Sequence, residues 1–440
     1  MTEPASRRYR WLRQSQKLRR RAMFLGGGIL TGLSAYAFAA LADDVQSYFG
    51  AAVKGRPALP WIVTPLGFAL AAWMGNRFFP NAQGSGIPQC IAAMQINDRK
   101  FRDRLLSMKL AFGKIILTLL GLACGASIGR EGPTVQIGAS IMSAMGPKSA
   151  KEQRALILAG SAAGIAAAFN APLAGVVFTI EELSRSFEAK TSGLILTTTI
   201  VAGLTATTIG GNYSYFGYAS GNLGTITDWI ALILTAILGG LLGGIFSRFV
   251  IEFSRRKRWQ DLVGRNRFPI WFALGCGAVV ALCGLVSGGT IFGTGYLEAS
   301  SVIHGSEPLP VFFVPLKLIA TAISSICGIP GGLFSPSLSV GAGIGSFVAQ
   351  VLDVSSAPQF ALLGMAAYLT GVVQSPITSV VIMAEMTDNH AMVVPLMICA
   401  LIANEISKRI SSVSIYHSLA LAFLPTPKPT PPAADPLSTP

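Results

Sequence analysis

The sequence has 440 residues, of which 51% are hydrophobic and only 12% are charged. Soluble domains carry about twice this charged fraction, so the composition excludes an ordinary soluble protein. The formal net charge of +14 lies mostly in short basic loops, which is typical of membrane topology and lipid contact and does not indicate nucleic-acid binding. Apolar stretches long enough to cross a bilayer recur along the chain. The composition therefore predicts an all-α, polytopic membrane protein.

The N-terminal segment 1–21 is strongly basic, with eight Arg or Lys between residues 7 and 21. The apolar run Ala22–Ala42 follows and ends in Ala40-Leu41-Ala42, which could pass for a signal-peptidase site. The basic lead-in is long for a signal peptide, so we interpret 1–21 as a cytoplasmic amphipathic segment before a first crossing. A second crossing is predicted from about Trp61 to Phe79.

Polar, glycine-rich stretches then interrupt the apolar pattern twice. Gly84-Ser85-Gly86-Ile87-Pro88 is a break that leads into another helix start. After the basic loop Asp98–Arg104, the largely apolar run Leu105–Ile128 ends at Gly129-Arg130-Glu131-Gly132-Pro133. A charged pair therefore lies where a membrane-embedded chain is expected to be uncharged.

Glu131 is the carboxylate of this second break. Pro133 has the fixed φ of a first-turn residue, which places Glu131 next to a helix N-terminus, where the helix dipole favours negative charge. A dissolved anion would bind there equally well, so carboxylate and anion would compete, and protonation of Glu131 would decide the competition. The alternative interpretation is an ordinary helix cap at the membrane surface.

The loop charges predict the topology of the remaining chain. Ile209–Thr227 and Val286–Glu307 contain no Lys or Arg and are expected outside, whereas Arg255–Arg267 and Lys408-Arg409 are basic and are expected inside. The charges of Lys148–Arg154 do not assign that loop to a side. Both termini are then cytoplasmic.

The chain also matches itself at an offset of about 203 residues. Gly129-x3-Pro133-x4-Gly138-Ala139-x-Ile141 recurs as Gly332-x3-Pro336-x4-Gly341-Ala342-x-Ile344, and the run from Gly160 to Glu181 is echoed from Gly364 to Glu385. We assign 22–215 and 226–410 to two membrane repeats. The loop charges make them inverted, an arrangement that places a substrate site between broken helices near the membrane midplane.

An apolar setting surrounds one lysine at the equivalent position of each repeat, Lys114 and Lys317. If both are buried, they add positive potential to a midplane anion site. The alternative for each is a long side chain that snorkels to the membrane interface. Six scattered cysteines without metal-ligand spacing are expected to be small buried hydrophobic residues, and no metal or cofactor is predicted.

These segments resemble the CLC family of chloride channels and proton-coupled chloride transporters. Gly84–Pro88, Gly129–Pro133 and Gly332-Leu333-Phe334-Ser335-Pro336 resemble its three signature motifs in the family's order, and Tyr416 falls where the family has an anion-coordinating tyrosine. The resemblance covers about residues 20–423. It implies an inverted repeat of about 18 tilted and broken helices, a separate pore in each subunit, and a homodimer.

The resemblance also implies roles for particular residues. Glu131 resembles the gating glutamate, and Glu182 resembles the internal glutamate that receives cytoplasmic protons in transporter members. The hydroxyls of Ser85 and Tyr416 would donate to the central anion, with backbone N–H groups completing its cage. The implied anion-binding positions are Ser85, Gly86, Ile87, Arg130, Gly132, Leu333, Phe334 and Tyr416.

The resulting prediction is a chloride/proton antiporter in a bacterial cytoplasmic membrane, and the main alternative is a passive chloride channel of the same fold. A fluoride exporter is disfavoured by the Gly84-Ser85-Gly86 pattern, and a nitrate preference by a serine at position 85. An enzyme is disfavoured because no nucleophile, metal-ligand set or cofactor motif is evident. Many family members carry a regulatory module after the last helix. Because the last helix-like segment, 411–424, is followed by a proline-rich stretch, 425–440, we expect that module to be absent and the tail to be disordered.

Overall fold

The computed structural model describes residues 3–146, 149–184, 189–211, 215–217, 223–255, 269–305, 309–354, 357–387 and 389–425. Within these ranges the chain is helical, and its only β-type pairings are two isolated bridges. The predicted proline-rich tail, apart from Pro425, and most of the basic stretch after Arg255 lie outside the described residues.

The first half of the chain contains α1 (Glu3–Gly55), α2 (Pro60–Phe78), α3 (Ile87–Gln95), α4 (Arg99–Asp103), α5 (Met108–Ala123), α6 (Glu131–Met145), α7 (Ala150–Phe169), α8 (Pro172–Phe178), the π-helical turn η1 (Thr179–Ser184) and α9 (Ala189–Gly210). The second contains α10 (Ile226–Arg255), α12 (Ile270–Val286), α13 (Tyr296–Ile303), α14 (Phe313–Ile326), α15 (Phe334–Val351), α16 (Ala357–Val373), α17 (Pro376–Thr387), η3 (His390–Met392) and α18 (Val393–Ile410). The chain then forms α19 (Ile415–Ala420) and η4 (Leu421–Phe423).

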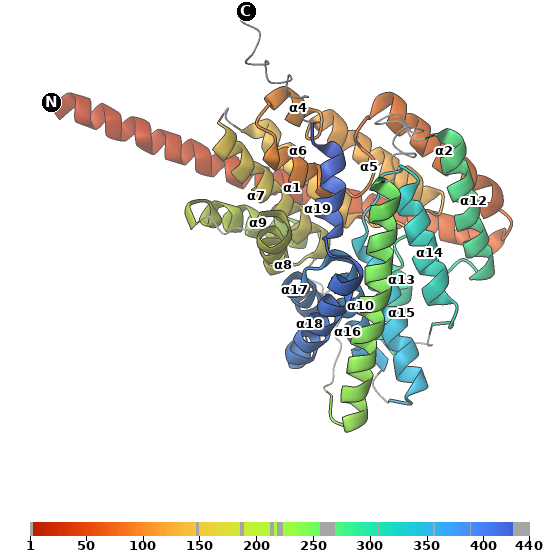
Figure 1. Ribbon diagram of the computed structural model, residues 1–440. Helices are drawn as coiled ribbons and strands as arrows, with labels where there is room; N and C mark the ends of the chain where they lie inside the picture. The colour runs from red at the N-terminus through yellow and green to blue at the C-terminus, as the bar shows by residue number, and fades with distance from the viewer. Residues whose placement is uncertain are drawn as a thin grey trace, which may run out of the picture.

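Helix α1 passes through the predicted boundary at residue 21 without a break, and its N-terminal part projects from the rest of the molecule (Figure 1). The basic segment and the first crossing are therefore one continuous helix. Four stretches are long and apolar enough to cross a membrane: Lys17–Gly55, Arg99–Ala123, Gly193–Gly210 and Ile226–Arg255. The segment predicted as a second crossing is a helix, α2, and is not among these four stretches.

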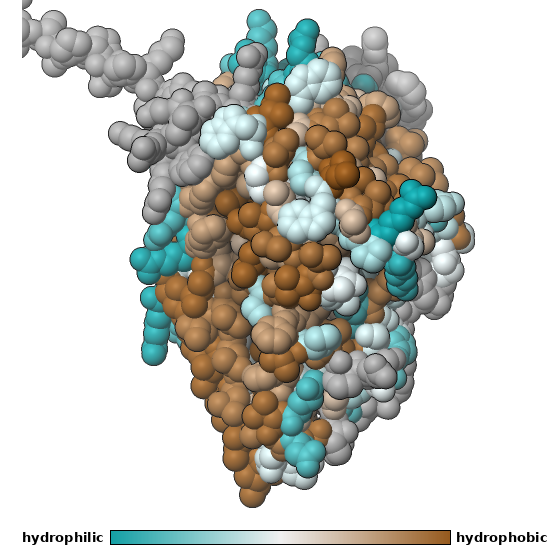
Figure 2. Space-filling model, turned by 90° about the vertical axis from the view of Figure 1, so that its right-hand side faces the viewer, coloured by the Kyte–Doolittle hydropathy of each residue, from teal (hydrophilic) through white to brown (hydrophobic). Residues whose placement is uncertain are grey.

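The surface agrees with a bilayer environment. Figure 2 shows a broad apolar area that continues from near the top of the molecule to its lower tip. Helices α2, α10 and α12 contribute exposed large apolar side chains, among them Trp61, Leu66, Ile230, Trp271 and Leu282. Apolar side chains at this density on the outside are stable against lipid but not against water.

Glycine pairs allow the long helices of each half to touch. A Cβ atom on Gly138 of α6 would overlap the carbonyl oxygen of Gly160 on α7, and a Cβ on Gly160 would overlap that of Gly138. The same reciprocal contact joins Gly341 of α15 and Gly364 of α16. These glycines belong to the predicted repeat. The two halves therefore share the way in which their helices pack as well as the sequence pattern.

A glutamate from each half of the chain also caps the N-terminus of a helix in the other half. In the turn after α8, Glu181 accepts hydrogen bonds from the backbone N–H groups of Ile377 (3.2 Å) and Thr378 (2.7 Å) at the start of α17. Its counterpart Glu385 accepts from those of Leu173 (3.0 Å) and Ala174 (2.6 Å) at the start of α8. Each helix thus ends beside the other's beginning, so α8 and α17 are antiparallel, as inverted halves require.

Candidate functional site

Backbone hydrogen bonds join the three glycine-rich segments singled out in the sequence. The N–H of Gly84 donates to Ile329 O and the N–H of Gly331 donates to Gly84 O, both at 3.1 Å. Gly129 and Gly332 exchange both of their backbone hydrogen bonds, at 2.8 and 2.7 Å. Segments about 45 and 200 residues apart in the chain therefore meet in one place.

Gly132 lies at this junction and requires the absence of a side chain. A Cβ atom on Gly132 would lie 2.9 Å from Ser85 O and 3.1 Å from the Cα of Gly332. Helices α3, α6 and α15 all begin within a few residues of the junction. Three helix N-termini near one point create positive potential there.

The two predicted intramembrane lysines are fully buried, so the snorkelling alternative is wrong for both. The Lys114 ammonium donates to the carbonyl oxygens of Ala82 and Gly84, each at 2.7 Å, and thereby anchors the loop before α3. The Lys317 ammonium does the same for the loop before α13, through Ile291 (2.9 Å) and Gly293 (2.8 Å). Within the described residues neither ammonium has a carboxylate at hydrogen-bond distance, and the Glu298 carboxylate interacts with Lys317 electrostatically.

The two loops that the lysines anchor are also equivalent, and they extend the repeat beyond the part found in the sequence. Gly84 and Gly86 have φ angles of 69° and 97°, and Gly293 and Gly295 have 66° and 76°. Gly86 and Gly295 are also the left-handed N-cap residues of α3 and α13. The two glycine turns are therefore equivalent, although the residues that follow them have diverged.

Glu131 is fully buried, so it is not a helix cap at the membrane surface. Its position differs from the prediction in one respect: the carboxylate reaches the N-terminus of α15 and not that of its own helix. The Ser335 hydroxyl donates to Glu131 Oε1, and the Ser335 backbone N–H points at Oε2 from 3.4 Å. The carboxylate thus occupies a helix N-terminus where a free anion would otherwise be stabilised.

Ser335 was not predicted as a site residue, although it belongs to the third glycine-rich segment. Replacing it by alanine removes a hydroxyl donor to a carboxylate, an interaction of about 1.5–3 kcal/mol. We expect Ser335→Ala to increase apparent anion affinity about tenfold, because the competing carboxylate is bound less well. Calorimetric anion titration measures this.

The matched control for that experiment is Ser337→Ala on the same helix. Ser337 is also buried, and its hydroxyl has no hydrogen-bond partner in the described structure. Unchanged affinity in Ser335→Ala, or an equal change in Ser337→Ala, would contradict a specific hold on Glu131.

Tyr416 lies on α19, as predicted, and is fully buried. Its ring stacks on Phe334 with a centroid distance of 6.3 Å, and α19 packs against α3, which follows Ser85. The Tyr416 hydroxyl has no hydrogen-bond partner within the described residues. Since a buried hydroxyl without a partner is costly, this one is suited to a ligand. Both Glu131 and Glu182 act on it electrostatically.

The Arg130 side chain is buried and makes a hydrogen bond and an ion pair with α1. Its guanidinium donates to the carbonyl of Ala39 at 2.7 Å and pairs with Asp43 at 2.6 Å, both on α1. The guanidinium also lies over the Tyr215 ring, 6.0 Å from the centroid. The side chain therefore connects α1 to the start of α6, while its Nε–H has no hydrogen-bond partner within the described residues.

Glu182 is buried, with a relative exposure of 2%, so it does not simply mark a helix end at the interface. Ser375 donates to Oε2 at 2.8 Å, and Ser414 donates to Oε1 at 2.8 Å. The His417 Nδ1 lies 3.2 Å from the same Oε1. Glu181 and Glu182 are consecutive residues of the π-helical turn η1 and point in different directions, so Glu181 caps α17 while Glu182 contacts α19.

His417 was missed because no sequence spacing relates it to Glu182, 235 residues away. Its one signal was its position directly after Tyr416. The six cysteines are all buried and none forms a disulfide, as expected.

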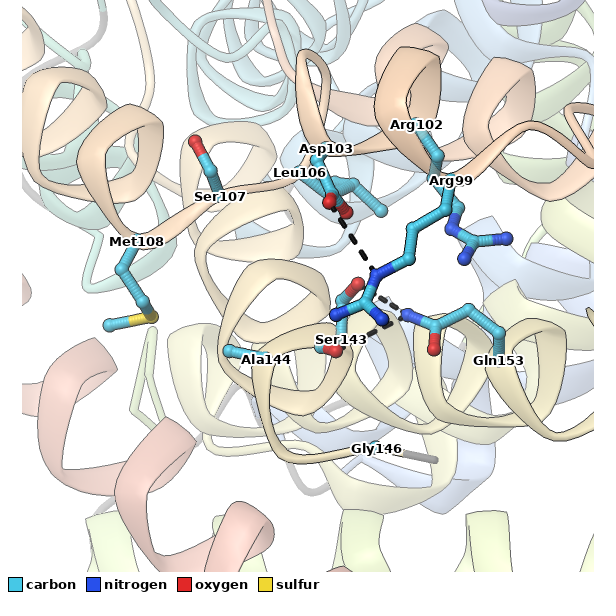
Figure 3. A pocket seen from close by; sticks show the side chains of 10 residues that line it. All are labelled: Arg99, Arg102, Asp103, Leu106, Ser107, Met108, Ser143, Ala144, Gly146 and Gln153. Carbon is cyan, nitrogen blue, oxygen red and sulfur yellow. Dashed lines mark hydrogen bonds and ion pairs between the residues drawn. The ribbon is translucent and has the colours of Figure 1, made fainter. Parts of the chain in front are cut away.

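A cavity of about 240 Å³ lies apart from this junction, at the far end of α6. Figure 3 shows the Arg99 side chain crossing it toward Asp103, with Ser143 and Gln153 on the opposite wall. The full lining is Arg99, Arg102, Asp103, Leu106, Ser107, Met108, Ser143, Ala144, Gly146 and Gln153. It contains none of the predicted site residues.

The fold and this junction define a polytopic helical membrane protein with an inverted repeat. Residues 67–408 match the family described as voltage gated chloride channel, and the chain belongs to that family.

Among solved structures, a slow cyanobacterial Cl⁻/H⁺ antiporter is 25% identical, with a TM-score of 0.74 over 92% of this chain and 97% of that one. A CLC-type fluoride/proton antiporter is 21% identical, with a TM-score of 0.76 and coverage of 90% and 96%. A eukaryotic CLC transporter is 21% identical, with a TM-score of 0.73 and coverage of 92% and 74%. The last two support the fold alone.

Proposed function

We propose that this protein exchanges chloride for protons across the membrane. The observation that carries the proposal is the buried Glu131 carboxylate at the N-terminus of α15, where it takes the place of an anion. The buried carboxylate of Glu182 supplies a second titratable group. The similarity to a cyanobacterial Cl⁻/H⁺ antiporter supports the same assignment.

The proposed cycle starts with Glu131 ionised and seated at α15. Protonation removes its charge and weakens its hold on the helix N-terminus, so that chloride replaces it. When Glu131 loses its proton and returns, it displaces the anion. Because the same carboxylate carries the proton and competes with chloride, movement of one ion is coupled to movement of the other.

Chloride in this cycle is held by hydroxyl and backbone donors. We assign the hydroxyls of Ser85 and Tyr416 to it, together with backbone N–H groups of Gly86, Ile87, Leu333 and Phe334. Neutral donors solvate a halide without the trapping strength of a full charge. Lys114 and Lys317 add long-range positive potential.

Loss of either hydroxyl is expected to weaken chloride binding by about 1 kcal/mol, or about fivefold. Calorimetric titration of chloride on Ser85→Ala and Tyr416→Phe measures the effect. Tyr368→Phe, a buried tyrosine on α16, is the matched control and should bind chloride like the wild type. Unchanged binding in both site variants would remove these hydroxyls from the site.

The proposal as a whole is tested with purified protein in liposomes. An outward chloride gradient should drive protons into the vesicles against their own gradient. Chloride flux without uphill protons would identify a passive channel of the same fold. A chloride, fluoride and nitrate series in the same assay identifies the preferred anion.

We further propose that the protein is a homodimer in a bacterial cytoplasmic membrane, with both termini in the cytoplasm. The basic inner loops support this orientation. Light scattering of the detergent-solubilised protein tests the dimer, and protease access to tags at each terminus tests the orientation.

A further inference from the structure

We propose that His417 loads Glu182 with protons from the aqueous side of the protein. This inference rests on the proposed function, since it concerns the proton branch of the exchange. The supporting geometry is the 3.2 Å contact between His417 Nδ1 and Glu182 Oε1.

Glu182 and His417 differ in how far their side chains are exposed to solvent. The Glu182 side chain is 2% exposed and the His417 side chain is 20% exposed. Water therefore reaches the imidazole more readily than it reaches the carboxylate. Within the described residues, the other partners of the carboxylate are the hydroxyls of Ser375 and Ser414, which donate hydrogen bonds but do not titrate in the physiological range. His417 is the one titratable contact that also meets solvent.

The proposed step is the transfer of one proton from the His417 imidazolium to the Glu182 carboxylate. The imidazolium Nδ1–H bond breaks and an Oε1–H bond forms, leaving a neutral imidazole beside a neutral carboxylic acid. A donor–acceptor separation near 3.2 Å is within reach for such a transfer. The ring then turns its bare Nδ1 toward water, takes up a proton, and turns back. Histidine is suited to this step because its charge ordinarily changes between pH 5 and 8.

Among the described elements that pack against α19, the charged side chains lie on α10. Helices α3, α10 and α16 pack against α19; α3 and α16 carry no charged side chain, although α16 contains Tyr368. On α10, Arg248 pairs with Glu252 at 2.8 Å, and the Arg255 guanidinium lies 3.4 Å from the Ser418 hydroxyl on α19.

Two further groups come from neighbouring positions. Tyr416 directly precedes His417 and interacts with the Glu182 charge. Glu181 directly precedes Glu182, and its carboxylate is bound at the start of α17. The Glu181 carboxylate is bound to the N–H groups of Ile377 and Thr378. His417 is the titratable side chain in hydrogen-bond contact with Glu182.

The test separates proton transfer from a merely structural contact. In His417→Asn the amide nitrogen can take the place of Nδ1 and keep the hydrogen bond, but it cannot exchange protons. We expect His417→Asn to slow uphill proton uptake at least about tenfold and to flatten its dependence on pH between 5 and 8. Chloride flux should remain. External imidazole should partly restore proton uptake in His417→Ala but not in His417→Asn.

Ser414→Ala is the matched control, since it removes a donor from the same Oε1 without removing a titratable group. It should shift the pH profile, because a carboxylate that loses a hydrogen bond binds its proton more tightly, but it should not flatten that profile. Wild-type proton uptake and pH profile in His417→Asn would overturn this inference alone, as the contact would then be structural. Absence of uphill protons in the wild type would overturn both the inference and the proposed antiport.

Discussion

Replacing Glu131 by glutamine is expected to abolish uphill proton movement while chloride still crosses the membrane. Glutamine has nearly the shape of the protonated side chain but cannot ionise, so it neither carries a proton nor competes with the anion as a charge. Chloride flux in Glu131→Gln should also lose its dependence on pH. Parallel recordings of chloride and pH in proteoliposomes measure both effects.

Glu385→Gln is the matched control for this variant. Glu385 also presents its carboxylate to a helix N-terminus, but its hydrogen bonds come from Leu173 and Ala174 of α8 and not from the glycine-rich segments. Coupling should survive in Glu385→Gln. Proton pumping by Glu131→Gln against a chloride-driven gradient would show that Glu131 is not the gate.

Replacing Glu182 by glutamine is the second large expected effect. Chloride flux should persist, because Glu182 bonds to Ser375, Ser414 and His417 and not to the glycine-rich segments. Uphill proton movement should be lost, because a proton route separate from the anion route needs a titratable group here. The same liposome assay reports both ions.

The neighbouring residue provides the control for Glu182. Glu181→Gln changes an adjacent glutamate whose carboxylate is committed to the start of α17. That variant should lose some stability but retain coupling. If Glu182→Gln still couples protons to chloride, the internal proton route must begin at another group.

Much of this architecture could be predicted because it depends on local chain chemistry. Glycines that permit positive φ, prolines that start helices and lysines in apolar runs all leave a pattern in the sequence. Their recurrence in both halves predicted the repeat, and the glycine contacts between α6 and α7 and between α15 and α16 confirm it.

The partners of the charged groups could not be predicted in the same way. Glu131 and Ser335 are 204 residues apart, and Glu182 and His417 are 235 residues apart. No periodicity links such positions; only the packing of one half against the other brings them together. The contacts of the Arg130 guanidinium could not be predicted for the same reason, because Ala39 precedes it by 91 residues.

The capping of α8 by Glu385 and of α17 by Glu181 has a consequence for biosynthesis. The carboxylate that satisfies the start of α8 belongs to Glu385, 212 residues later in the chain. At a synthesis rate of about 5–20 residues per second, α8 waits roughly ten to forty seconds for that partner to be made. During this interval its N-terminal N–H groups lack their final acceptor. The first half therefore enters the membrane incomplete, and the ribosome must finish most of the second half before either becomes fully hydrogen-bonded.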